Sequence, residues 1–192
     1  MPSIVVLIQN AIASLAVDYS ECHQLSPVYV GSEEAPSTGK QIFAAYQAAK
    51  RGNKQLPILA DDTDTSVYGR EHNQLYRFIH DIDHAMAYQQ GKGTTRLEHE
   101  VALNLQFTLK VFEKVFYQTS RLDSALMAFF ICYYDTVGQA VEYSKTGNFV
   151  ANQKQFVYDK LQSCKAWQAL KHGQTMLARQ YFDAILINAK EF

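Results

Sequence analysis

The chain has 192 residues, and 47% of them are hydrophobic, which is typical of one domain with a substantial buried core. Its 18 basic and 19 acidic side chains give a formal net charge of −1. This balance creates no basic field that would concentrate the protein on nucleic acid or on an anionic membrane, so neither partner is predicted. The three cysteines, Cys22, Cys132 and Cys164, form no C-x-x-C pair, which argues against a zinc ribbon or redox motif and predicts reduced, buried thiols.

The N-terminal run, residues 1–17, shares some apolar character with a signal peptide. No basic residues precede it, however, and Gln9 and Asn10 interrupt it. The longest later apolar stretch, 125–134, falls short of the roughly 20 residues that span a bilayer. The sequence therefore predicts a soluble, cytoplasmic protein.

The first predicted element is an amphipathic helix that follows a Ser3 cap. Its apolar residues recur at helical spacing: Ile4, Ile8, Ala11, Ile12 and Leu15. The β-branched run 4–6 leaves a strand as the alternative. Residues 20–37 have the proline and glycine content of a loop, with one extended piece at 28–30. Such a loop would be able to cover a site.

A second helix is predicted over 37–51, with Ser37 or Thr38 as its cap and Gly52 just past its end. The connection 56–65 is turn-like and acidic. It contains Pro57 and the cluster Asp61, Asp62 and Asp64. A third helix is predicted over 66–90 and is closed by Gly91.

The next helix begins at a capping box, Thr95-x-x-Glu98, and the turn 91–93 should fold it back on the helix before it. Ser120-x-x-Asp123 repeats the capping pattern and predicts a long helix to about Ser144, with Gly147 as its stop. Two further helices are predicted over 150–162 and 166–188.

Apolar stripes on the later helices support a packed bundle. One stripe comprises Leu122, Leu126, Phe129, Tyr133, Val137 and Ala140, and another comprises Trp167, Leu170, Leu177, Tyr181 and Ile185. The sequence thus predicts an all-α, single-domain bundle of about six or seven helices. An N-terminal helix and irregular loop region would occupy 1–65, and the bundle 66–192.

The strongest chemical signal is a polar stripe, Arg77, His80, Asp81 and His84, in the segment YRFIHDIDHAMAY. These residues stand at i, i+3, i+4 and i+7, so all four project from one helix face. His80 and His84, one turn apart, can reach a single ion, and Asp81 can either ligate it or orient a histidine. The stripe predicts a metal site.

The helix after the Gly91 turn offers candidates for an additional ligand. Glu98 is already explained by the capping box, and His99 points about 100° away from each neighbour and is expected at the surface. Glu100 has no such local role, so it is the preferred ligand.

A second polar stripe comprises Cys132, Asp135, Gln139 and Glu142. It either faces solvent or closes the site opposite His80. Asp135 and Gln139 are second-tier ligand candidates, because an aspartate inside an aromatic helical run is less common than an aspartate on a plain surface. Asp123 is weaker because the cap explains it, and the isolated His23 and His72 are expected to be structural or surface residues.

The alternative interpretation of the main stripe is an exposed polar face. Arg77 would then pair with Asp81 four residues on, and the histidines would be incidental. Such a pair stabilises a helix by only about 0.3 to 0.5 kcal/mol.

The segment RFIHDIDH, with a following acidic residue in LEHEVALNLQ, resembles a group of uncharacterised bacteriophage-encoded proteins with an R-x-x-H-D-x-x-H…E core. The later DTVGQAVEYSKTGNFVANQKQF looks like a stretch of the same group, so the resemblance spans about 56–161. It implies a phage or prophage origin, a helical fold and no established activity. Its signature positions are Arg77, His80, Asp81, His84, Glu100 and Gln139.

A local resemblance links FIHDIDH to the L-H-D-I-G-H core of HD-type metal phosphohydrolases, which are also helical. In that family the His-Asp pair binds metal beside an upstream His and a downstream Asp. Here the upstream residue would be His23, the downstream residue Asp123 or Asp135, and Asp83 stands where the family has glycine.

Two functions follow. The first is a metal-dependent hydrolase in which zinc, manganese or iron is held by His80, Asp81, His84 and Glu100. Arg77 would bind a phosphate-containing small molecule. Arg77 and Asp81 would be the catalytic residues. The second is a non-enzymatic phage protein that binds a host or phage protein, with the stripe as a structural ion or hydrogen-bond site. Its oligomer or partner surface would be aromatic: Phe129, Phe130, Tyr133 and Tyr134.

Overall fold

The computed structural model describes residues 2–60, 66–92 and 96–189. This part of the chain is predominantly helical, with one two-stranded sheet, which confirms the all-α prediction. The N-terminal elements are α1 (Ile4–His23), β1 (Ser26–Val30), α2 (Gly39–Arg51) and β2 (Gln55–Leu59). The later helices are α3 (Arg70–Gln89), α4 (Leu97–Thr119), α5 (Leu122–Tyr133), α6 (Gln139–Thr146), α7 (Gln153–Ser163), α8 (Lys165–Lys171) and α9 (Thr175–Ala189).

The two helices predicted near the N-terminus both form. The Ser3 hydroxyl accepts a hydrogen bond from the Val6 amide, and α1 then continues to His23, well into the segment that was expected to be loop. Thr38 caps α2 and exchanges hydrogen bonds with Gln41 in a capping box. The extended piece predicted at 28–30 is the end of β1.

The turn predicted from residue 56 onward is wrong, because Gln55–Leu59 forms β2. It pairs in parallel with β1, and Val28 lies opposite Pro57. A proline is tolerated here because a two-stranded sheet consists only of edge strands. Leu56 and Ile58 alternate into the core, which is the pattern of a half-buried strand. The acidic cluster 61–64 lies outside the described residues.

α3 begins at Arg70 rather than at residue 66, because Ser66 and Tyr68 form a buried turn in front of it. Gly91 ends this segment with a φ of +74°, in the left-handed region that favours glycine. α4 follows with Arg96 at its N-cap position, and Thr95 of the predicted capping box lies outside the described residues.

The long helix predicted from Ser120 is interrupted. Ser120 is not its cap: it ends α4 in a left-handed conformation, and Asp123 pairs instead with Arg121. Between α5 and α6 the chain forms a π-helical turn, Tyr134–Gly138. The final predicted helix is likewise divided, into α8 and α9, at Gly173, whose φ is +72°.

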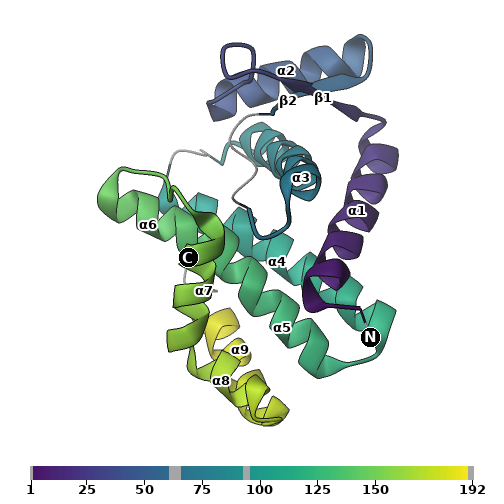
Figure 1. The fold of residues 1–192 in the computed structure, drawn as a ribbon. Coiled ribbons are helices and arrows are strands. Elements are labelled where there is room, and N and C mark those ends of the chain that lie inside the picture. The colour runs from purple at the N-terminus through teal and green to yellow at the C-terminus, as the bar shows by residue number, and fades with distance from the viewer. Residues whose placement is uncertain (1, 61–65, 93–95, 190–192) are drawn as a thin grey trace.

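The central pair of helices is α4 and α5, which lie side by side (Figure 1). Helices α1 and α3 pack on α4. Helix α2 and the small sheet pack on the far side of α3, and α8 and α9 lie at the opposite end of the molecule.

The core buries Phe107, Phe129 and Phe130, so the prediction of a partner surface at Phe129 and Phe130 is wrong. Cys132 is buried as predicted, whereas Cys22 is exposed and Cys164 is half-buried.

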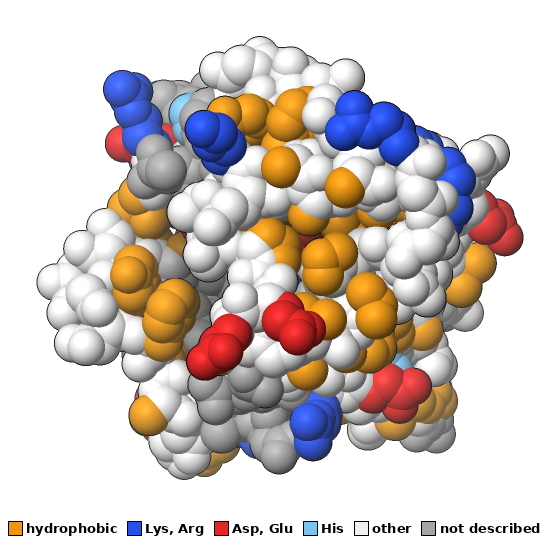
Figure 2. Space-filling model, turned by 90° about the horizontal axis from the view of Figure 1, so that it is seen from above, with side chains coloured by type: hydrophobic (Ala, Val, Ile, Leu, Met, Phe, Trp, Pro, Cys, Tyr) orange, Lys and Arg blue, Asp and Glu red, His pale blue; other side chains and the backbone are white. Residues whose placement is uncertain are grey.

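The end of the molecule that carries α2 and the strands mixes apolar, basic and acidic side chains (Figure 2). No field of one charge dominates the described residues on this face, as the near-zero net charge suggests.

Among the described helices, α1 is long and apolar enough to cross a membrane by length and composition alone. It packs against α3, α4 and α5, and core helices of soluble proteins pass the same test.

Candidate metal centre

Three ligand-type side chains converge where α3 packs on α4. His80 Nε2 lies 2.9 Å from His84 Nε2 and 2.9 Å from Glu100 Oε1. His84 Nε2 lies 3.1 Å from Glu100 Oε2. The three side chains together could hold a metal ion, with ligand atoms all within 4.8 Å of one another. Of the candidate ligands taken from the sequence, the structure brings these three together.

Local sequence explains this convergence. His80 and His84 stand one turn apart on α3, so their rings project from the same face and meet edge to face, with centroids 4.4 Å apart. Glu100 lies in the first turn of α4, where the positive end of the helix dipole favours a carboxylate. Glu98, one residue before His99, is exposed, as the preference for Glu100 predicted.

The spacing of the three donors fits a small divalent cation. In a tetrahedral site with metal–ligand distances of about 2.0 to 2.1 Å, neighbouring ligand atoms are about 3.3 Å apart. The observed separations of 2.9 to 3.1 Å therefore need to open by only a few tenths of an ångström. Side-chain rotations of this size leave the two helices in place.

The site is enclosed rather than exposed, which argues against the plain polar face. Only 13% of the His80 side chain, 9% of the His84 side chain and 31% of the Glu100 side chain are accessible. No ion pair within 4 Å joins Arg77 to Asp81 in the described part of the chain. The pairing that the alternative interpretation requires is therefore missing.

The electrostatics of the triad favour a negative Glu100. Burial raises the pKa of Glu100, but the hydrogen bonds and charges of His80 and His84 outweigh it and hold that pKa well below its usual range. Burial lowers the pKa of His80, and Glu100 reverses this, so the pKa of His80 is raised overall. A carboxylate that stays ionised is a competent metal ligand at neutral pH.

Two residues that the sequence reasoning missed hold Glu100 in place. The Tyr76 hydroxyl donates a hydrogen bond to Asn104 Oδ1 at 2.6 Å, and Asn104 Nδ2 donates to Glu100 Oε1 at 3.0 Å. The Tyr76 ring also stacks on His80, with centroids 5.4 Å apart. Asn104 is one turn after Glu100, a spacing that could have identified it. The Nδ1 atoms of His80 and His84 are buried and have no protein partner among the described residues.

Asp81 does not join the converging group. Burial raises the pKa of Asp81 to about 7, against the lowering effects of His80 and Arg77. Asp81 therefore interacts electrostatically with His80 and Glu100, but its carboxylate is not among the converging ligand atoms.

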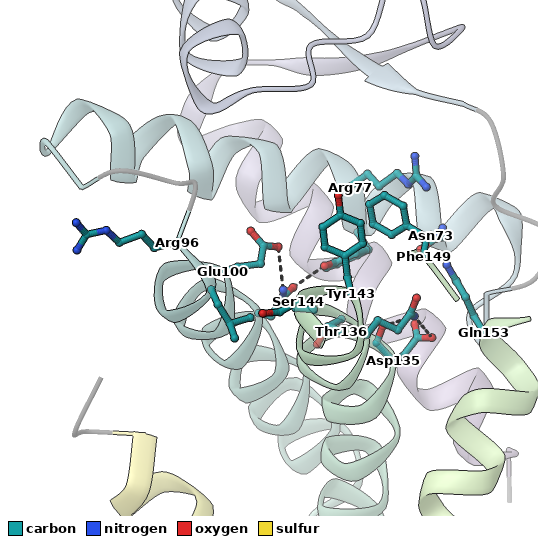
Figure 3. A pocket seen from close by; sticks show the side chains of 15 residues that line it. Asn73, Arg77, Arg96, Glu100, Asp135, Thr136, Tyr143, Ser144, Phe149 and Gln153 are labelled. Atoms are coloured by element: carbon teal, nitrogen blue, oxygen red, sulfur yellow. Dashed lines mark hydrogen bonds between the residues drawn. The ribbon is translucent and has the colours of Figure 1, made fainter. Parts of the chain in front are cut away.

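A pocket of about 510 Å³, a volume suited to a small-molecule ligand, opens beside Glu100 (Figure 3), and His80 and His84 are not among its lining residues. Arg77 and Glu100 line it from α3 and α4. Asp135, Thr136 and Gln139 line it from the π-helical turn and the start of α6. Two residues of the second polar stripe, Asp135 and Gln139, thus lie at this pocket, whereas Cys132 is buried in the core and Glu142 pairs with Lys160. Arg96 adds a second guanidinium, and Tyr143 and Phe149 stack on each other at 4.4 Å between centroids.

The other histidines lie apart from this centre. The ring of His23 contacts the Tyr46 hydroxyl at 3.0 Å, between α1 and α2, so it does not serve as the upstream ligand of an HD-type site. His99 is half-buried and lines a different, smaller pocket.

No family model, no curated protein and no solved structure matches this chain.

Proposed function

We propose that the protein is a metal-dependent hydrolase of a phosphate-containing substrate. The observation that carries this proposal is the convergence of His80 Nε2, His84 Nε2 and the Glu100 carboxylate within 3.1 Å. Of these three residues, Glu100 also lines the neighbouring pocket of about 510 Å³. Two histidines and one glutamate form a donor set that hydrolytic zinc sites use, and three protein ligands leave coordination positions open for water or substrate.

The chemistry of the donors narrows the ion. Imidazole nitrogen and carboxylate oxygen suit zinc, manganese or iron better than a metal that prefers thiolates. A bound ion of this kind lowers the pKa of a coordinated water toward about 7 and polarises the bond under attack. The centre is enclosed, with His84 only 7% exposed, so a bound ion would be shielded from bulk solvent and would face the pocket on its Glu100 side.

Arg77 supplies the argument for an anionic substrate. It lies one turn before His80 and Asp81 on the α3 face and lines the pocket together with Glu100. Its planar fork of donors matches a phosphate oxygen pair better than an ammonium group does. Arg96 also lines the pocket, but its guanidinium points away from the other lining side chains (Figure 3), so Arg77 is the residue that supports an anionic substrate. The likeness to bacteriophage-encoded proteins rests on the same residues, and the phage origin and the cytoplasmic location remain predictions.

The first test is the metal content of the purified protein, measured by mass spectrometry for the native chain and for His80→Ala, His84→Ala and Glu100→Gln. We expect about one ion per native chain and its loss from all three variants. His172→Ala is the matched control, because His172 is exposed on α8's C-terminal turn and contacts a backbone carbonyl. A native protein that stays metal-free after supplementation with zinc, manganese and iron would contradict the proposal.

The second step uses the metal-loaded protein and a panel of phosphate esters. Hydrolysis that disappears with His80→Ala supports the enzyme. Stoichiometric metal without hydrolysis of any phosphate ester would instead favour a structural ion in a protein that binds a host or phage partner, and pull-downs would then identify that partner.

A further inference from the structure

Asp135 is an unusual residue in its setting. It lies in the middle of a run of apolar and aromatic residues, and only 5% of it is exposed. A carboxylate is costly to bury without a cation, and the described residues place no Lys or Arg within 4 Å of it. The burial of this carboxyl group therefore needs a physical explanation.

Asp135 and its neighbour Thr136 lie in the π-helical turn. Here both are buried, at 5% and 4% exposure, and both line the pocket that Glu100 lines from the other side. Single π-helical turns inside α-helices occur frequently at functional sites. Figure 3 shows Asp135 and Glu100 on different elements of the same pocket.

We infer that Asp135 is the proton donor to the leaving oxygen of the phosphate ester, in the reaction proposed above. A substrate with its phosphorus at the triad and its charge on Arg77 would extend its ester oxygen toward the π-helical turn. Water forms the new bond to phosphorus, and the bond from phosphorus to the ester oxygen breaks. The Asp135 proton passes to that oxygen. The proton lost by the water restores Asp135, so that alcohol and phosphate leave with all atoms balanced.

The surroundings of Asp135 keep the acid available at neutral pH. Burial raises the pKa of Asp135 to about 7, against the lowering effects of Tyr68 and Gln139. Gln139 Nε2 donates to Asp135 Oδ1 at 3.1 Å. The other ionisable neighbours are Tyr68, Tyr76 and Cys132, and all three stay neutral because burial raises their pKa values. A donor whose pKa lies near the working pH is the most effective general acid.

The decisive experiment compares two substrates in the metal-loaded protein. The 4-nitrophenyl phosphate leaving group departs without protonation, whereas an alkyl phosphate needs an acid. We expect Asp135→Asn to lower kcat/KM about 100-fold or more on the alkyl ester and much less on the nitrophenyl ester. The variant should also lose the fall in rate above about pH 7, while its metal content stays native. Asp159→Asn, the same change at an exposed position of α7, is the control.

A second measurement does not depend on activity. The NMR signal of the Asp135 carboxyl carbon can be assigned because it is absent from the spectrum of Asp135→Asn. In the metal-free protein its chemical shift should titrate with a midpoint near pH 7. Should Asp135→Asn fail to fold, Gln139→Leu tests the same role: loss of its hydrogen bond should move the Asp135 titration, and the falling limb of the rate profile, to higher pH.

The outcomes separate the two proposals. Equal losses on both esters, or titration of Asp135 in the ordinary range below about pH 5, would overturn the role of Asp135 and leave the hydrolase intact. A metal-loaded native protein that hydrolyses neither of these esters nor any other member of the phosphate-ester panel overturns both. Metal lost from Asp135→Asn would also overturn it, because the residue would then be a ligand.

Discussion

Glu100 owes its position to a hydrogen-bond relay that starts on the neighbouring helix. Tyr76 orients the Asn104 amide, and that amide donates to the same Glu100 oxygen that contacts His80. Partners of this kind fix a ligand's geometry without touching the metal, and their loss commonly costs 10- to 100-fold in metal affinity.

Tyr76→Phe should therefore weaken metal binding about tenfold, because it removes the hydroxyl that aligns Asn104 while keeping the ring that stacks on His80. Competition with a chromophoric chelator measures the change in affinity. Tyr88→Phe, at the exposed end of α3, serves as the control and should have no effect. Equal affinities for Tyr76→Phe and the native protein would mean that the relay does not position the ligand.

At this scale the sequence predicted much of the centre. Helical spacing alone joined His80 to His84, and the capping argument selected Glu100 over Glu98. The part played by Asp81 was not predictable in the same way, since spacing places it on the face of the histidines but does not say how far its short side chain reaches. Tyr76 was missed because its hydrogen bond to Asn104 crosses from α3 to α4, whereas Asn104, one turn after Glu100 on the same helix, could have been found from the spacing.

At the scale of elements, a polar cluster fastens α1 to α3 and α4. The Tyr19 hydroxyl donates to Asp83 Oδ1 at 2.7 Å, and Lys110 lies 3.4 Å from Asp83 Oδ2 and contacts the Tyr19 hydroxyl. Only 13% of the Asp83 side chain is accessible. Its charge would be left poorly compensated if Lys110 were removed.

We expect Lys110→Met to lower the free energy of unfolding by about 2 kcal/mol, because breaking an enclosed pair strands the other charge. Lys160→Met is a close control. Lys160 also lies over an aromatic ring and 3.6 Å from a carboxylate, but both partners of that pair are more exposed, at 43% and 33%. The control should change stability by less than about 1 kcal/mol. Urea unfolding compares the two, and equal losses would contradict the role of burial.

Element boundaries show where sequence patterns stop being informative. The caps at Ser3 and at Ser37 or Thr38 were predictable because capping is a local interaction, and the structure selects Thr38. The same local pattern at Ser120 was misleading, because Ser120 ends α4. The strand at Gln55–Leu59 depends on pairing with β1 some 29 positions earlier, and Pro57 masked its alternation. The π-helical turn at Tyr134–Gly138 leaves the apolar period nearly unchanged, so nothing in the spacing indicated it.

At the scale of the whole molecule, the enclosed acids tie stability to pH. The folded chain binds the Asp135 proton more tightly than the unfolded chain, whose pKa is about 3.9, because burial raises the folded pKa to about 7. The stability that this group contributes is fully present below about pH 4 and is lost as the pH rises through 7. Asp81 and His80, whose pKa values are also raised, act in the same direction.

The metal-free protein should therefore unfold more easily at pH 8 than at pH 5, with Asp135 alone accounting for on the order of 2 kcal/mol. Glu100 adds no slope in this window, because its lowered pKa confines its effect to more acidic solutions. Chemical unfolding of the native chain and of Asp135→Asn at both pH values isolates the contribution. If the free energy of unfolding of the native chain and that of Asp135→Asn changed equally between pH 5 and pH 8, Asp135 would be ionised in the folded state.

The three converging donors are separated by no more than 20 positions, from His80 to Glu100. Closing so short a loop costs little chain entropy, so the helical hairpin of α3 and α4 can assemble its centre early in folding, before distant segments have docked. An ion captured at that stage would act as a folding template. Asp135 arrives from a later part of the chain, so a nascent or truncated protein would hold metal before it gained a reactive pocket.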